Sequence, residues 1–337
     1  MKLTFDEIKK YTRGAEQVLN TPQGIRFLRF TQEELAAYEP NPLKDKCLSA
    51  AGIRIAFTTD ASAVSLALTV TDRGSSRSYF SVEVQADGKR AGAIRNFTDE
   101  MDVETMKLCC PGGDFAQSFP LEAGEKTLEI YLPWSREMLL KDLTLEGATF
   151  CRPLEKRPIL LMYGDSITHG YDAAYPSESY SNRLADALGM EVFNKAIGGE
   201  TFFPALAECT PALAPQMITV AYGSNDWKKK SREELLTNAR LFLTALSERH
   251  PHTPIFLMTP LWRKDQEPYL YGEFPLVTED LKAIGAEYPN ITVLVGLDLV
   301  PKDTALFFDG RLHPNSAGFA HYAKNLKEAI QCSRPKK

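Results

Sequence analysis

The chain has 337 residues, 44% of them hydrophobic and 25% charged, and its 39 basic against 44 acidic residues give a formal net charge of 39 − 44 = −5. This length suggests about two domains of roughly 100–200 residues, each large enough to bury its own core. The ordinary composition excludes disordered, collagen-like and coiled-coil chains. The slightly acidic balance removes the electrostatic reason to expect a nucleic acid or an anionic membrane surface as partner, and we expect neither.

The compartment follows from the N-terminus and the cysteines. The first ten residues include Asp6 and Glu7 and hold no apolar core of signal-peptide length. No run approaches the ~18 apolar residues that a membrane span needs. The six cysteines are scattered and form no CxxC pair, which is typical of neither a disulfide framework nor a zinc site. The sequence therefore predicts a cytoplasmic protein without metal or other cofactor, and it carries no signal for an oligomeric state.

The first half of the chain has the pattern of antiparallel β structure. A short helix is expected around Gln32–Tyr38. After it, apolar and other residues alternate with period two in several short segments, as in strands with one buried face. Asp87-Gly88 is a hairpin-turn signal. We therefore predict a β-sandwich or jelly-roll accessory domain over residues 1–152. The alternating segments are Ile53–Phe57, Val64–Val70, Phe80–Val84, Thr127–Leu132 and Leu143–Glu146.

The second half changes to apolar runs without alternation, which are typical of central parallel strands covered on both faces. Helical segments lie between the runs. The clearest of them begins after Ser231, with Glu234 completing a capping box, and ends before Pro251. This pattern predicts a three-layer α/β/α domain with a mostly parallel sheet over residues 153–337. The runs are Ile159–Tyr163, Glu191–Asn194, Ile218–Tyr222, Ile255–Met258 and Ile291–Val295.

Catalytic and ligand-binding residues are expected just after these runs, because ligands bind at the carboxyl ends of the strands in such sheets. Gly164-Asp165-Ser166 follows the first run, Gly198-Gly199 the second and Gly223-Ser224-Asn225-Asp226 the third. Asp309 and His313 precede the last helix. The set contains a hydroxyl at a strand–helix junction, a base that can activate it, and amide donors, which are the groups that acyl transfer needs.

These four segments, in this order and at strand ends, resemble the four sequence blocks of the SGNH, or GDSL, hydrolase superfamily of esterases and lipases. The resemblance covers about residues 159–330 and implies a flavodoxin-like fold. It also implies that Ser166 attacks an ester carbonyl, that His313 is the base and that Asp309 orients His313. The implied oxyanion hole consists of the N–H groups of Ser166 and Gly199 and the side-chain amide of Asn225, with no metal.

One departure concerns the orienting acid. The last block of the family usually has Asp three residues before His, whereas Asp309 is four residues before His313. The extra residue can bulge outward and leave the contact between the two side chains in place. Alternatively, a backbone carbonyl holds His313 and the site is a Ser–His dyad.

The predicted β domain before the hydrolase domain resembles the two-domain carbohydrate esterases that remove acetyl groups from plant polysaccharides. This resemblance implies an O-acetylated saccharide as substrate, either a small molecule or an oligosaccharide. A lipase, a lysophospholipase or a thioesterase would use the same residues on a longer acyl chain, and a non-catalytic carbohydrate-binding protein is a further alternative. Candidate substrate contacts are Trp227, Trp262 and His169, each of which could instead be a packing residue.

Overall fold

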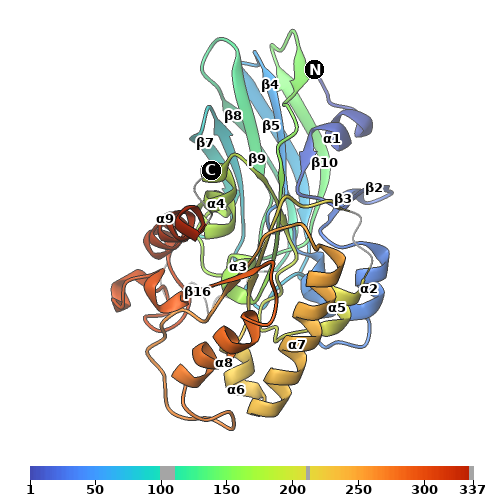
Figure 1. Cartoon of the computed structure of the whole chain (residues 1–337). Coiled ribbons are helices and arrows are strands. Elements are labelled where there is room, and N and C mark those ends of the chain that lie inside the picture. Colours follow the sequence, from blue (N-terminus) through green and yellow to red (C-terminus); the bar gives the residue numbers. More distant parts are fainter. Residues whose placement is uncertain (99–110, 210–212, 334–337) are drawn as a thin grey trace. The chain divides into compact units, whose positions relative to one another are not determined.

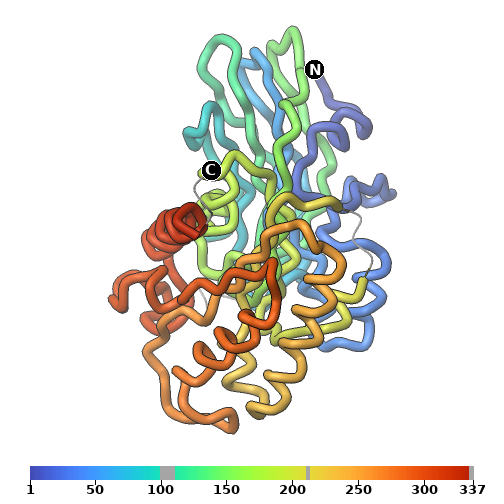
Figure 2. Tube along the Cα trace, in the orientation of Figure 1, coloured from blue at the N-terminus to red at the C-terminus, as the bar shows by residue number. Residues whose placement is uncertain are grey.

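The structure is a computed structural model that describes residues 1–98, 111–209 and 213–333. It divides the chain into two compact units (Figures 1 and 2). The chain passes from the long segment of unit 1 into unit 2 between Arg157 and Pro158, close to the predicted boundary after residue 152. The units are also interleaved, which the sequence did not predict. Unit 1 comprises Met1–Thr31, Asp45–Arg157 and Ala174–Ser177, and unit 2 comprises Gln32–Lys44, Pro158–Ala173 and Glu178–Lys337.

Unit 1 consists of two antiparallel sheets, with strand orders β1-β4-β9-β6-β7 (β11 beside β4) and β2-β3-β10-β5-β8. Buried apolar side chains of both sheets form one cluster, so the predicted sandwich is confirmed. In β5 every second residue is buried, as the alternation predicted. The elements are α1 Phe5–Tyr11, β1 Thr12–Arg13, β2 Gln17–Thr21, β3 Gly24–Leu28, η1 Lys44–Leu48, β4 Arg54–Thr59, β5 Ala63–Val70, β6 Ser81–Ala86, β7 Lys89–Arg95, β8 Gly113–Pro120, β9 Lys126–Tyr131, β10 Met138–Glu146 and β11 Cys151–Pro153.

Unit 2 contains a five-stranded parallel sheet of order β13-β12-β14-β15-β16. This order is that of flavodoxin-like folds, so the predicted α/β class is confirmed. The elements are α2 Gln32–Tyr38, β12 Ile159–Gly164, α3 Ser166–His169, η3 Pro176–Glu178, α4 Tyr180–Leu188, β13 Glu191–Asn194, α5 Pro204–Glu208, β14 Met217–Ala221, α6 Ser224–Lys229, α7 Arg232–Arg249, β15 Ile255–Met258, α8 Pro275–Gly285, β16 Ile291–Leu294, η4 Gly296–Asp298, η5 Thr304–Leu306 and α9 Ser316–Ser333.

Helices cover both faces of this sheet (Figure 1). On one face, side chains of α4 and α9 pack with Leu160 and Met162 of β12. On the other face, Phe242 of α7 lies 5.4 Å from the ring of Tyr163. Helix α7 begins at the predicted capping box. Within the three described ranges of the chain, no helix is both long and apolar enough to cross a membrane.

Helix α2 has the predicted bounds but packs in unit 2. Its Glu34 accepts a 2.7 Å hydrogen bond from Lys195, and the hydroxyl of Tyr38 donates to Glu200 at 2.5 Å. The ring of Tyr38 lies 4.9 Å from that of Phe203, so this blue segment runs beside the yellow-green α5 (Figure 2). The assignment of all residues before 153 to one domain therefore does not hold for 32–44.

Candidate active site

The sheet of unit 2 has a topological switch point at its first strand. The strand that follows β12 in the chain, β13, lies on one side of it, and β14 lies on the other. Ligands bind at the carboxyl edge of such a point. Ser166 follows the end of β12 and Asn225 follows the end of β14, so both lie at this edge. A Cβ at Gly164 would lie 2.3 Å from the hydroxyl of Thr168, so glycine is needed for α3 to begin directly at the strand end.

Ser166 is the first residue of α3, and Asp165 is its N-cap. One carboxylate oxygen of Asp165 accepts from the N–H of Ile167 at 3.0 Å, and the other accepts from the Asn225 amide at 3.4 Å. Burial raises the pKa of Asp165 to about 6, although the backbone hydrogen bond and the charge of His313 act in the opposite direction. Asp165 therefore links the turn that carries Ser166 to the loop that carries Asn225.

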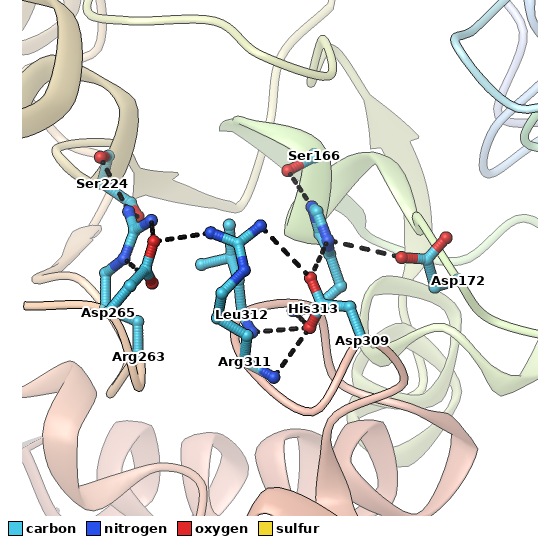
Figure 3. A network of polar contacts seen from close by, with 9 residues as sticks. All are labelled: Ser166, Asp172, Ser224, Arg263, Asp265, Asp309, Arg311, Leu312 and His313. Carbon is cyan, nitrogen blue, oxygen red and sulfur yellow. Dashed lines mark hydrogen bonds and ion pairs between the residues drawn. The ribbon is translucent and has the colours of Figure 1, made fainter. Parts of the chain in front are cut away.

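His313 connects the serine to a carboxylate (Figure 3). Its Nε2 lies 2.9 Å from Ser166 Oγ, and its Nδ1 lies 3.1 Å from Asp309 Oδ2. The other oxygen of Asp309 accepts the backbone N–H groups of Arg311, Leu312 and His313 at 2.7–3.1 Å. Burial opposes ionisation, but the hydrogen bonds from His313 and the backbone hold the pKa of Asp309 well below its usual range.

The extra residue between Asp309 and His313 is accommodated within a closed loop. A bridge pairs Phe307 with Pro314, and the N–H of Phe308 donates to the carbonyl of His313 at 2.7 Å. Gly310 has φ +62°, which a glycine adopts without strain. The two ends of the loop thus bring the carboxylate to the imidazole. This geometry corresponds to the first of the two alternatives, in which the contact between Asp309 and His313 stays in place.

The second block forms a tight turn over Ile197–Glu200. The N–H of Glu200 donates to the carbonyl of Ile197 at 3.0 Å, and Gly199 has φ +87°. A positive φ at this position is what a type II turn requires, and glycine provides it. The N–H of Gly198 donates to Nδ1 of His169 at 3.1 Å, so the turn is anchored on the helix that carries Ser166.

The third loop is tied to the second by Asp226. This side chain is fully buried, and its oxygens accept the N–H groups of Phe202 and Gly223, each at 3.0 Å. Burial raises the pKa of Asp226 to about 7. Together with Asp165, it connects the loops that carry Ser166, Gly199 and Asn225, the three predicted donors of an oxyanion hole.

A row of alternating charges runs from the Asn225 loop to Asp309 (Figure 3). The buried Arg263 donates to Ser224 Oγ at 3.1 Å and makes a bidentate pair with Asp265 at 2.7 and 2.8 Å. Arg311 donates to Asp265 at 2.6 Å and lies 3.7 Å from Asp309. Burial works against the charge of Asp265, but the two arginines lower its pKa to about 2. These contacts connect the loop that carries Asn225 to the loop that carries Asp309 and His313.

A second carboxylate beside His313 was missed by the sequence analysis. Oδ2 of Asp172 lies 3.3 Å from Nδ1 of His313, and the Asp172 side chain is fully buried. Asp172 follows α3 in a turn outside the four blocks that carried the resemblance. The one available signal was a charged residue six positions after Ser166, and the local sequence pattern assigns no role to such a residue.

Two of the three expected substrate contacts are corrected. Trp227 is 0% exposed, and its indole N–H donates to the carbonyl of Gly272, so the ring is a packing residue. His169 is 1% exposed, and it holds the Gly198 turn rather than facing a substrate. Trp262 is half-buried against Phe307, and its contact with substrate stays a prediction. Among the residues that the structure describes, no group of three or more His, Cys, Asp or Glu could hold a metal ion.

Comparisons with known proteins agree with the fold. Residues 162–321 match the GDSL-like Lipase/Acylhydrolase family. No curated protein matches the chain. A salicylyl-acyltransferase from a tetracycline biosynthetic pathway is 21% identical over 97% of this chain and 96% of its own, with a TM-score of 0.80.

Two further solved structures have the same architecture. A family two carbohydrate esterase from Clostridium thermocellum is 12% identical over 95% of this chain and 98% of its own, with a TM-score of 0.68. An acetyl xylan esterase from the rumen bacterium Butyrivibrio proteoclasticus is 14% identical over 98% of both chains, with a TM-score of 0.64. At these identities the likeness establishes the fold alone, a flavodoxin-like α/β domain together with a β-rich domain.

Proposed function

Residues 162–321 form a GDSL-like lipase/acylhydrolase domain and the chain is a carboxylic ester hydrolase, and on this premise we propose that it removes O-acetyl groups from a saccharide. The observation that carries the proposal is the chain of contacts from Ser166 Oγ to His313 (2.9 Å) and from His313 to Asp309 (3.1 Å). It supports roles for Ser166 as nucleophile, His313 as base and Asp309 as the orienting acid.

In the first half-reaction, Ser166 Oγ forms a bond to the ester carbonyl carbon while its proton passes to Nε2 of His313. The carbonyl becomes an oxyanion, and the N–H groups of Ser166 and Gly199 and the amide of Asn225 would hold it. The intermediate collapses as the carbon–oxygen bond to the sugar breaks, and the imidazolium returns its proton to the departing alkoxide. The Ser166 acyl ester remains.

In the second half-reaction, His313 takes a proton from water while the water oxygen attacks the acyl carbon. The Ser166 oxygen leaves and recovers the proton, so acetate is released and the site is regenerated. The carboxylate of Asp309 stabilises the imidazolium in both halves, because its low pKa keeps it ionised throughout the working pH range.

The choice of an acetylated saccharide rests on architecture. Two of the similar structures are described as a family two carbohydrate esterase and an acetyl xylan esterase, and both share the two-unit organisation over nearly their whole length. The TM-score of 0.80 with the salicylyl-acyltransferase favours a second candidate, in which an alcohol rather than water accepts the acyl group. The acyl-enzyme is common to both, and only the second half-reaction differs.

The test is a panel of p-nitrophenyl esters from acetate to palmitate, run beside acetylated xylo-oligosaccharides and repeated with an added alcohol acceptor. We expect turnover of acetate and of the acetylated sugars, and its loss in Ser166→Ala. Ser247→Ala is the matched control, since Ser247 lies near the C-terminal end of α7 and its hydroxyl donates to Asn290, just before β16.

Each alternative has its own result in this panel. A rate that rises toward palmitate would contradict the acetyl preference and favour a lipase or thioesterase. Ester products of the added alcohol in place of free acetate would favour acyl transfer. Sugar binding without turnover of any ester would favour a carbohydrate-binding protein.

A further inference from the structure

His313 has two carboxylates on the same ring nitrogen. Nδ1 lies 3.1 Å from Asp309 Oδ2 and 3.3 Å from Asp172 Oδ2 (Figure 3). The two acids come from different parts of unit 2, one from the loop before α9 and the other from the turn after α3. A single N–H can be shared between two acceptors at these distances. Of the two, Asp172 is the more buried, with 0% of its side chain exposed against 11% for Asp309.

The backbone at Asp172 favours glycine rather than aspartate. The N–H of Ala173 donates to the carbonyl of Gly170 at 3.1 Å, which closes a turn, and Asp172 has φ +71° at its third position. Among the described residues outside glycine, only Asp87 shares this conformation, and it lies in a hairpin turn. A residue held in a left-handed conformation at a buried site is a reason to look for a function of its side chain.

Tyr171 fixes the direction of this turn. Its N–H donates to the carbonyl of Ser166 at 3.0 Å, and its ring stacks on His313 with 5.9 Å between centroids. The same ring makes a T-shaped contact with His169, with 5.2 Å between centroids. The turn that carries Asp172 therefore directly follows the short helix that carries the nucleophile, and its Tyr171 ring contacts His313.

From this geometry we propose that Asp172 is a second positioning acid, which shares the Nδ1 proton of His313 with Asp309 and stabilises the imidazolium during acyl transfer. The inference rests on the proposed function of Ser166 and His313. It also gives a reason why the site accommodates the longer spacing between Asp309 and His313, because orientation of the imidazole does not depend on one carboxylate.

The charged groups around the imidazole define the expected pH behaviour. Asp309 and Arg311 lie on its own loop, Asp172 on the turn after α3, and Asp165 at the start of α3. Both Asp172 and Asp309 favour the protonated ring. Removing either one should therefore move the acidic limb of the kcat/KM profile toward lower pH.

The experiment compares Asp172→Asn, Asp309→Asn and the double variant. Where one acid orients the base, its Asn variant loses about 10⁴-fold in kcat. With two acids we expect about 3–30-fold for Asp172→Asn, about 10–100-fold for Asp309→Asn and about 10⁴-fold for the double variant, which exceeds the product of the single losses. The same ratios should hold for labelling of Ser166 by a fluorophosphonate probe, which requires no knowledge of the substrate.

Two controls separate the carboxylate from the turn. Asp172→Gly suits the left-handed backbone but lacks the acid, and we expect it to lose as much activity as Asp172→Asn while folding at least as stably. Asp87→Asn changes the other left-handed aspartate, whose carboxylate accepts from Thr127, and should leave kcat unchanged. Recovery of wild-type rate in Asp172→Gly would assign Asp172 to the turn alone and overturn the proposal.

Other outcomes are equally decisive. Losses in the double variant that equal the product of the single losses, with an unshifted pH profile, would overturn the shared-proton role. Absence of phosphonate labelling in folded wild-type protein would overturn both this inference and the proposed nucleophile. Labelling that depends on Asp172 without turnover of any acetylated sugar would support the inference and reject only the proposed substrate.

Discussion

Gly198→Ala tests whether the packing of Tyr171 against the Gly198 turn determines the position of the His313 imidazole. An added Cβ would lie 2.3 Å from the ring of Tyr171, where ordinary contact begins at 3.4 Å, so the ring or the turn must move by about 3.4 − 2.3 = 1.1 Å. Tyr171 stacks on His313, so part of this movement reaches the imidazole. A misplacement of about 1 Å can cost about 10²-fold in rate, and we expect kcat to fall about 10–100-fold.

Gly285→Ala is the matched control, because its Cβ would meet Val293 at the same 2.3 Å between α8 and β16. Overpacking should cost each variant about 1–3 kcal/mol in urea unfolding. Only Gly198→Ala should lose kcat with p-nitrophenyl acetate, while Gly285→Ala stays within about twofold of wild type. Equal kcat losses in the two variants, or a wild-type kcat in Gly198→Ala, would refute the coupling through Tyr171.

Three further predictions concern single residues. Asn225→Ala removes one proposed oxyanion donor and should lower kcat about 10²–10³-fold with little change in KM, as steady-state kinetics would show. Trp227→Phe loses the hydrogen bond to Gly272 and should destabilise the fold by about 1–3 kcal/mol in urea titrations without altering KM for any sugar ester, whereas a raised KM would restore the tryptophan as a substrate contact. Asp165 is a carboxyl whose folded pKa is raised to about 6 from 3.8, so the folded state holds a proton that the unfolded chain has lost. Its contribution to stability is therefore present below pH 3.8 and is lost as the pH rises to about 6, and Asp165→Asn, which keeps the N-cap acceptor, should flatten that slope in unfolding experiments.

Local periodicity was enough to predict most of the fold. The five parallel strands and the capping box at Ser231 were visible because each is encoded in one continuous segment. Strand β7 was missed because its outer half, Lys89–Ala91, is exposed and its residues do not alternate. The helix at Gln32–Tyr38 was predicted, but its partners Lys195 and Glu200 are more than 150 residues away in the chain. No local pattern carries that information.

The site divides in the same way. Ser166, Gly199, Asn225 and His313 lie in motifs directly after strands or before a helix, and topology alone gathers such positions at one edge. Asp172 could not be predicted as a site residue, because its contact with His313 depends on a local turn and joins positions 141 residues apart in the chain. Trp227 follows the third block, in α6, but the direction of a side chain is set by packing, and the Trp227 ring is buried.

The early helix α2 also bears on how this protein can be dissected and how it is made. A fragment that begins at Pro158 would contain the whole family match but lack Glu34 and Tyr38, which meet Lys195 and Glu200 beside the Gly199 turn. On the ribosome, Glu34 and Tyr38 are synthesised more than 150 residues before Lys195 and Glu200, so these contacts form only after most of the chain has been made. A fragment cut at the boundary between Arg157 and Pro158 would therefore lack the partners of Lys195 and Glu200, which flank the Gly199 turn.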